Sequence, residues 1–136
     1  MSVADLLERL QANSVPGGAF DWRSIRDEIH AEHDRAATTK DRETLLSVHK
    51  AVMDLVERNM PQGDDLEKFR TLRSQDYNLL LIKEAMIGDT SGIINQERMA
   101  EITSREVAAG RMSPHDELHK LAVKPPKVSL FKRLFG

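Results

Sequence analysis

The chain has no cysteine among its 136 residues. Disulfides, thiolate metal sites and cysteine nucleophiles are therefore excluded. Asp5 and Glu8 interrupt the first apolar residues, so the start resembles neither the basic beginning nor the unbroken apolar stretch of a signal peptide. The longest purely apolar run, residues 79–82, is far shorter than the roughly 20 residues that span a bilayer. We therefore expect a cytoplasmic protein.

Aromatic residues are the second scarcity. There are six of them: Phe20, Trp22, Phe69, Tyr77, Phe131 and Phe135. Apolar residues nevertheless make up 40% of the chain and charged residues 31%, which is typical of a folded protein rather than a disordered one. The core must therefore be mainly aliphatic.

The net charge of −2 conceals an uneven distribution. All 22 acidic residues and 15 of the 20 basic ones lie in residues 1–117, which gives that segment a net charge of −7. The remaining residues, 118–136, carry +5 with no acidic residue. A charge asymmetry of this kind indicates a terminal segment with its own binding task.

Apolar residues recur with helical spacing almost throughout, and no convincing strand is found. We predict an all-α fold, a single compact bundle of five or six helices with a short basic amphipathic C-terminal tail. Residues 1–122 form the helical domain, and residues 123–136 form a Pro-Pro linker and the tail. Helices are predicted over about residues 3–10, 22–36, 39–60, 66–87, 94–109 and 114–123.

Helix boundaries are predicted from capping residues. Asp21, Thr38 and Ser113 are expected as N-caps, and Gly110 is expected to end the fifth helix. The second half of the helix over 66–87 is apolar on nearly every side, so we expect it to be the most buried element.

The chain has five histidines, which are candidate metal ligands, and four of them form two close pairs. His30 and His33 are three residues apart, and His115 and His119 are four apart. The second pair is similar to the zinc peptidase pattern His-Glu-x-x-His, but Asp116 stands where that pattern has glutamate, and no third ligand follows. We interpret the histidines as solvated side chains on charged helix faces, and expect no metal. A metal-dependent enzyme remains an alternative.

Residues 103–121 resemble a helix-turn-helix unit, with Ala108, Leu118 and Leu121 near its packing positions. The predicted recognition helix, however, begins with Asp116 and Glu117, which would face phosphates. A small DNA-binding regulator is therefore the runner-up function, and we expect no nucleic-acid partner.

No catalytic constellation is visible in the sequence. Ser91 does not lie in a nucleophile elbow, and no phosphate-binding glycine loop occurs. Carboxylate pairs such as Asp64 and Asp65 lie on expected helix starts, and nothing in the sequence indicates the burial that a catalytic acid or base needs. We therefore expect a protein that is not an enzyme and uses no cofactor.

The tail is the strongest functional signal. Its apolar residues recur at helical spacing and are interleaved with basic ones, and two of the six aromatic residues lie among its last six positions. The candidate binding residues are Lys127, Val128, Leu130, Phe131, Lys132, Arg133, Leu134 and Phe135.

Three roles for the tail stay open at this point. It could pack on its own domain, bind a groove on a protein partner, or lie on an anionic membrane surface. On a membrane each basic residue contributes about 1 kcal/mol, and ordering the tail costs about 1.5 kcal/mol per residue. Membrane contact by the tail alone would therefore be weak and reversible.

Residues 127–131, Lys-Val-Ser-Leu-Phe, resemble the bacterial sliding-clamp-binding pentapeptide Gln-Leu-Ser/Asp-Leu-Phe. Ser129, Leu130 and Phe131 match the motif, and Lys127 replaces its glutamine. The resemblance implies a protein groove as the binding partner. Our prediction is an all-α interaction module, adaptor or regulator, whose tail binds a protein partner or a membrane surface. A homo-oligomer is also possible.

Overall fold

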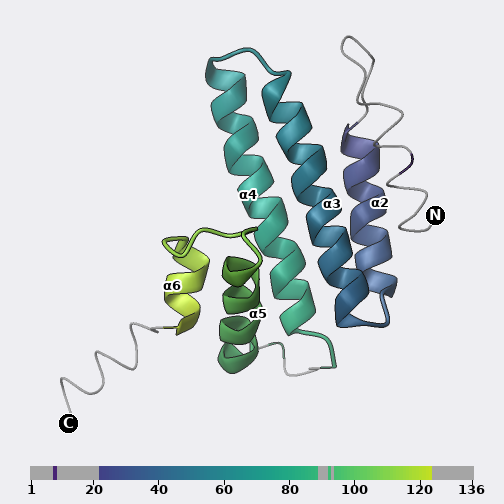
Figure 1. Ribbon diagram of the computed structural model, residues 1–136, viewed down its shortest axis with the longest axis vertical. Coiled ribbons are helices and arrows are strands. Elements are labelled where there is room, and N and C mark those ends of the chain that lie inside the picture. Colours follow the sequence, from purple (N-terminus) through teal and green to yellow (C-terminus); the bar gives the residue numbers. More distant parts are fainter. Residues whose placement is uncertain (1–7, 9–21, 89–91, 93, 124–136) are drawn as a thin grey trace, which may run out of the picture. The chain divides into compact units, whose positions relative to one another are not determined.

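The computed structural model describes residue 8, residues 22–88, residue 92 and residues 94–123. Across these residues the regular structure is entirely helical, which confirms the predicted all-α fold (Figure 1). The helices are α2 (Trp22–Arg35), α3 (Thr39–Arg58), α4 (Asp64–Ala85), α5 (Gln96–Ala108) and α6 (Glu117–Val123). The helix predicted over 3–10, the N-cap predicted at Asp21 and the tail lie outside the described residues.

The chain divides into two compact units, Met1–Leu80 and Leu81–Gly136. The boundary falls inside α4, which contributes residues 64–80 to the first unit and residues 81–85 to the second. Each unit has its own buried residues and its own polar links between helices, so the two are described separately below.

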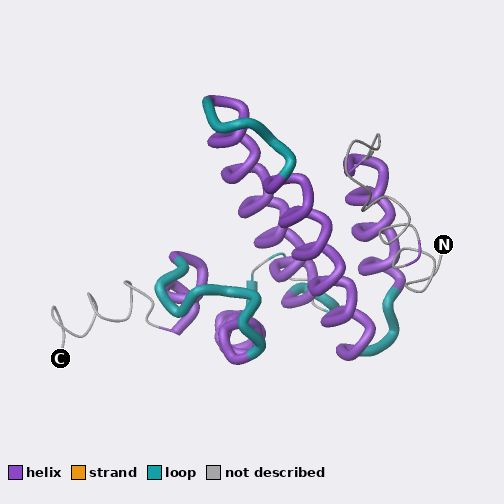
Figure 2. The backbone as a smooth tube through the Cα atoms, turned by 45° about the horizontal axis from the view of Figure 1, so that its top comes forward, coloured by secondary structure: helices purple, strands orange, loops and turns teal. Residues whose placement is uncertain are grey.

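In the first unit α2, α3 and the first part of α4 run in alternating directions, joined by short turns (Figure 2). The faces that meet between α2 and α3 are apolar. Ile25 and Ile29 of α2 are buried one helical turn apart, and Leu46 and Val52 of α3 are fully buried as well. This spacing is the predicted apolar stripe, which places one face of each helix in the core.

Two aromatic side chains of the first unit, Trp22 and Phe69, lie in one cluster. Phe69 of α4 packs with Met53 and Val56 of α3, and Trp22 and Met60 cover this cluster. The rings of Trp22 and Phe69 meet edge to face, with centroids 5.2 Å apart and planes at 83°. That geometry is favourable for two aromatic quadrupoles. Two of the few rings in the chain are therefore used to join the start of α2 to α4.

Two of the predicted helix boundaries are confirmed. The Thr38 hydroxyl accepts a hydrogen bond from the Asp41 backbone N–H at 3.1 Å, as an N-cap of α3 does. Gly110 follows α5 with φ of +76°, a left-handed conformation that glycine adopts without strain. The backbone N–H groups of Gly110 and Arg111 donate to the carbonyls of Val107 and Glu106, which is a Schellman motif.

The predicted start of the last helix is wrong. α6 begins at Glu117, not at Pro114. Ser113 shapes a turn, because its hydroxyl accepts from the His115 N–H at 3.1 Å and its carbonyl accepts from the Asp116 N–H at 3.0 Å. Asp116 caps the helix instead, because its Oδ1 accepts from Leu118 N–H at 2.9 Å and its carbonyl accepts from Lys120 N–H. Asp116, and not Ser113, is therefore the N-cap of α6.

The expected burial of the second half of α4 is also wrong in part. Leu80, Leu81 and Ala85 are buried, but Leu79 is 47% exposed and Ile82 is only half-buried. An apolar run that surrounds a helix leaves some of its members in solvent unless neighbours cover every side. None of the described helices is both long and apolar enough to cross a membrane.

We predict that Phe69→Ala destabilises the first unit by about 3–5 kcal/mol, because it removes the ring that Trp22, Met53 and Val56 contact. Trp22 is the only tryptophan of the chain, so its fluorescence during urea unfolding reports on this unit. Leu72→Ala on the same helix is the control, since Leu72 is 39% exposed. Equal losses for the two variants would contradict the assignment of Phe69 to the core.

Candidate functional site

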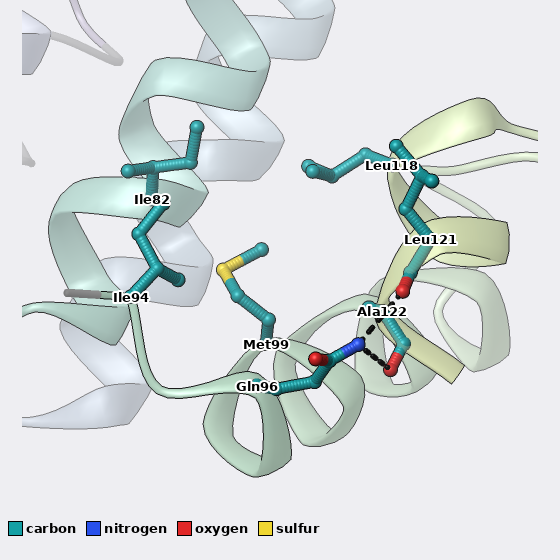
Figure 3. A pocket seen from close by; sticks show the side chains of 7 residues that line it. All are labelled: Ile82, Ile94, Gln96, Met99, Leu118, Leu121 and Ala122. Carbon is teal, nitrogen blue, oxygen red and sulfur yellow. Dashed lines mark hydrogen bonds between the residues drawn. The ribbon is translucent and has the colours of Figure 1, made fainter. Parts of the chain in front are cut away.

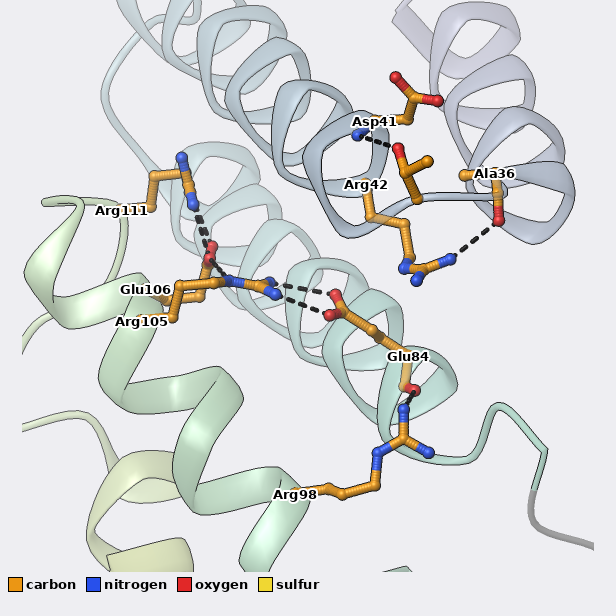
Figure 4. A network of polar contacts seen from close by, with 9 residues as sticks. Ala36, Asp41, Arg42, Glu84, Arg98, Arg105, Glu106 and Arg111 are labelled. Atoms are coloured by element: carbon orange, nitrogen blue, oxygen red, sulfur yellow. Dashed lines mark hydrogen bonds and ion pairs between the residues drawn. The ribbon is translucent and has the colours of Figure 1, made fainter.

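A buried ion pair joins α5 to the end of α4 in the second unit. Arg105 donates two hydrogen bonds to Glu84, from Nη1 to Oε2 at 2.7 Å and from Nη2 to Oε1 at 3.0 Å (Figure 4). Only 5% of the Glu84 side chain is exposed. A two-pronged contact of guanidinium with carboxylate fixes both distance and orientation. Glu84 therefore sets how α5 lies against the end of α4.

A second carboxylate, Glu106, extends this network. Arg105 Nε donates to it at 3.0 Å, and Arg111 donates from Nε at 2.8 Å and from Nη2 at 2.7 Å. The Glu106 side chain is fully buried. Burial by itself would lower the pKa of Arg105, but its hydrogen bonds to Glu84 and Glu106 outweigh this and raise the pKa. Two buried negative charges are thus matched by two arginines.

Two further side chains close the ends of helices in this unit. Arg98 of α5 donates from Nη1 to the Ile87 carbonyl at 2.6 Å and from Nη2 to the Glu84 carbonyl at 3.1 Å. Gln96 donates from its amide nitrogen to the carbonyls of Leu121 and Ala122, at 2.8 and 3.2 Å. Carbonyls at a helix end have no partner in the helix itself. α5 therefore supplies the donors that hold the ends of both α4 and α6.

The second unit also contains an apolar pocket of about 180 Å³, which is open to solvent (Figure 3). Figure 3 shows Met99 between Ile82 and Ile94 on one side and the leucines of α6 on the other. Gln96 is the only polar residue of the lining, and its amide nitrogen is already bonded to the end of α6. The lining residues are Ile82, Ile94, Gln96, Met99, Leu118, Leu121 and Ala122.

The rim of the pocket is unusually apolar for a protein surface. Ile94 is 42% exposed and Leu121 is 49% exposed. Val123, the last described residue of α6, is 41% exposed, and Ile87 of the same unit is 44% exposed. Exposed apolar residues are ordinary when scattered, but exposed ones that line a pocket, as Ile94 and Leu121 do, indicate a binding surface.

The first unit contains a different polar cluster, centred on Asp76 of α4. Nε2 of His30 on α2 donates to Oδ1 at 2.9 Å, and Nε2 of His49 on α3 donates to Oδ2 at 2.7 Å. Only 12% of the Asp76 side chain is exposed, and 2% of His49. Burial would raise the pKa of Asp76, but the hydrogen bonds and charge of the two histidines hold it well below its ordinary value. One carboxylate thus joins three helices.

The expectation that the histidines are solvated is wrong for two of the five, which are buried, and in part for two more, which are half-buried. His33 and His49 are buried, and His30 is half-buried against Asp76. His115 is exposed as expected, and His119 is half-buried and contacts the Thr103 hydroxyl at 2.9 Å. Within the described residues, no group of three or more His, Asp or Glu side chains has the arrangement of a metal site.

The segment that resembles a helix-turn-helix has a different packing pattern from the one expected. Of its three predicted packing residues, Ala108 and Leu121 are exposed and Leu118 is half-buried. The helix predicted to read DNA, α6, extends only from Glu117 to Val123. Leu118 and Leu121 line the pocket instead of a helix–helix core.

The candidate binding residues of the tail lie outside the described residues. They are Lys127, Val128, Leu130, Phe131, Lys132, Arg133, Leu134 and Phe135. The last described helix, α6, ends at Val123, immediately before Lys124 and the two prolines.

No protein-family model, curated protein or solved structure matches this chain. Its function is therefore inferred from its own residues.

The sequence contains only a weak signal for the buried ion pair. Lys83 and Glu84 both lie between Ile82 and Ala85 at the end of an apolar run, and a charged residue beside such a run favours a buried partner. The pocket and the Asp76 cluster left no such signal, because the residues that form them come from separate helices.

We predict that Asp76→Asn destabilises the first unit by about 1.5–3 kcal/mol at pH 7, because it replaces a charged double acceptor by an amide. The pKa of Asp76 is lowered in the fold, so its contribution is complete above about pH 4, the range of the ordinary value of 3.8, and is lost as pH falls through the lowered pKa. Urea unfolding followed by Trp22 fluorescence should show the difference between variant and wild type shrinking below that pH.

The matched control for this prediction is Asp27→Asn on α2. Its side chain is 73% exposed and contacts only the neighbouring Arg26, at 3.4 Å, among the described ion pairs. Exposed pairs of this kind contribute about 0–1 kcal/mol. A pH-independent difference between wild type and Asp76→Asn would contradict the role given to Asp76.

We predict that Glu84→Gln lowers the stability of the second unit by about 3 kcal/mol, since it leaves the Arg105 guanidinium partly unmatched. Replacing both partners, Glu84→Leu with Arg105→Met, should restore much of the loss because no buried charge then lacks its counter-ion. Thermal unfolding followed by far-UV circular dichroism measures both, with Glu101→Gln as the exposed control on α5. A double variant less stable than Glu84→Gln would show that the pair itself is stabilising.

Proposed function

We propose that this protein is a non-enzymatic, cytoplasmic helical interaction module, of adaptor or regulatory type, whose C-terminal tail binds a groove on a protein partner. The observation that carries the proposal is the composition of residues 127–135. Leu130, Phe131, Leu134 and Phe135 are the apolar anchors, and Lys127, Lys132 and Arg133 provide electrostatic attraction.

The spacing of the tail supports a groove-binding segment. Val128, Phe131 and Leu134 follow one another at intervals of three residues, and Phe135 completes the same face of a helical wheel. Amphipathic segments with anchors at this spacing bind apolar grooves of partner proteins. Aromatic anchors also dominate the energetics of most interfaces.

The position of the tail supports the proposal as well. Lys124, Pro125, Pro126 and Lys127 separate the anchors from the end of α6, and two successive prolines cannot continue a helix. The anchors therefore form a distinct segment, which can be presented to a partner without any change in the helices that precede it.

The buried titratable groups are consistent with a scaffold role for the helical body. Asp76 accepts hydrogen bonds from His30 and His49. Glu84 accepts from Arg105, and Glu106 accepts from Arg105 and Arg111. Groups held in this way join helices and fix their orientation.

We predict that replacing two anchors, Leu130→Ala with Phe131→Ala, weakens partner binding by at least about 30-fold. Each truncated anchor at the centre of an interface costs about 2 kcal/mol, and 1.4 kcal/mol is tenfold in affinity. The full chain is used to capture partners from an extract of the source cells, and the Kd of each purified partner is then measured by titration calorimetry. Because residues 127–131 resemble the sliding-clamp pentapeptide, purified bacterial sliding clamp is a defined first protein to titrate.

The matched control is Leu72→Ala, which truncates an exposed leucine of α4 and leaves the tail unchanged. A partner whose Kd is equal for wild type and the double variant would contradict the proposal. Co-sedimentation of the chain with anionic vesicles forms a separate arm. Binding to vesicles that depends on Leu130 and Phe131, without any captured protein, would assign the tail to a membrane surface instead.

A further inference from the structure

We infer that the apolar pocket of the second unit is a binding site for the tail of the same chain, and that it takes one phenylalanine ring, from Phe131 or Phe135. Ile82, Met99 and Leu118 would contact the ring, and the exposed rim at Ile94 and Leu121 would contact the neighbouring leucines of the tail.

The volume and lining of the pocket select the ligand. An engineered apolar cavity of about 150 Å³ binds benzene, so a pocket of about 180 Å³ holds one aromatic ring and not a whole amphipathic helix. Its single polar lining residue, Gln96, uses its amide nitrogen to hold the end of α6. Met99 adds a flexible thioether, which makes favourable contacts with aromatic rings.

The tail supplies the only phenylalanine rings in the sequence of the second unit. Residues 81–123 contain no Phe, Tyr or Trp, whereas residues 124–136 contain Phe131 and Phe135. No aromatic side chain therefore lines the pocket, and the phenylalanine rings that follow it in sequence belong to the tail.

The length of the tether allows the return. Phe131 lies eight residues after Val123, and a segment of this length reaches about 26 Å when extended. α6, which contributes Leu118 and Leu121 to the pocket, has seven residues and is about 10 Å long. The chain that leaves α6 is therefore long enough to return along α6 to Leu118 and Leu121 of the pocket.

Tethering also makes a small contact effective. A short flexible linker gives an effective concentration on the order of millimolar, so a site with a millimolar Kd for the free peptide is about half occupied within one chain. Charge adds to this attraction. The tail carries Lys124, Lys127, Lys132 and Arg133 and no acidic residue, whereas Glu97 and Glu101 of α5 and Glu117 of α6 are exposed.

A regulatory consequence follows, and this part rests on the proposed function. A phenylalanine held in the pocket is withheld from a partner, so the partner must displace the tail before it binds. The pocket would then lower the apparent affinity for the partner in proportion to its occupancy.

The docking is tested on the full chain by nuclear magnetic resonance of methionine methyl groups labelled with carbon-13. A ring seated in the pocket moves the Met99 methyl resonance to higher field, and the variant Phe131→Leu with Phe135→Leu should return it. Met53 is the internal control, because it lies in the first unit beside Phe69. The Met99 shift should be unchanged on tenfold dilution.

Two results would overturn the inference. An identical Met99 resonance in wild type and in the double variant means that no tail ring enters the pocket. A shift that disappears on dilution means that the tail enters the pocket of a second copy rather than its own. A variant of the rim, Leu121→Lys, provides a second measurement and should abolish the shift, whereas Leu72→Lys, at an exposed leucine of the first unit, should not.

Partner capture separates this inference from the proposed function. If Leu121→Lys abolishes the Met99 shift and strengthens partner binding, both are supported. If the shift is present but removal of residues 128–136 leaves capture unchanged, the docking stands and the proposed function fails. If removal abolishes capture but the shift is absent, the proposed function stands and the docking fails.

Discussion

A carboxylate that leaves water must be met by cationic or hydrogen-bonding partners, and this requirement fixes the helix contacts of both units. Asp76 joins α2, α3 and α4 through His30 and His49. Glu84 joins the end of α4 to α5 through Arg105. With few aromatic rings to provide shape, an aliphatic core leaves the orientation of its helices loosely defined. The paired carboxylates supply direction where apolar packing supplies only proximity.

The helices themselves could be predicted from the sequence, because their signals are local. The apolar spacing of Ile25 and Ile29, the cap at Thr38 and the glycine at 110 each involve residues within a few positions of one another. The start of α6 shows how such signals compete. Ser and Asp are about equally favourable as N-caps, so the sequence does not show whether Ser113 or Asp116 caps α6.

The polar clusters and the pocket could not be predicted in the same way. His49 and Asp76 are 27 residues apart, and His30 and Asp76 are 46 apart. Histidines on charged helices are solvated unless a distant residue meets them, and that residue is known only once the helices are arranged. The pocket depends equally on tertiary structure, since Ile82, Met99 and Leu118 come from three helices. The candidate binding residues of the tail, by contrast, are predicted from composition alone and lie outside the described residues.

The connection between α5 and α6 contains one segment whose length is constrained by hydrogen bonds to Glu106 and a second segment with only local bonds. Glu106 accepts backbone bonds from Arg111 and Met112 through its carbonyl, and side-chain bonds from Arg111 through its carboxylate. The number of residues between 106 and 111 is therefore set by two independent groups of the same amino acid. Residues 113–115 are exposed and carry only local bonds. Natural variation in the length of this connection should therefore accumulate at 113–115, where an added residue changes the path of a turn without separating Glu106 from Arg111.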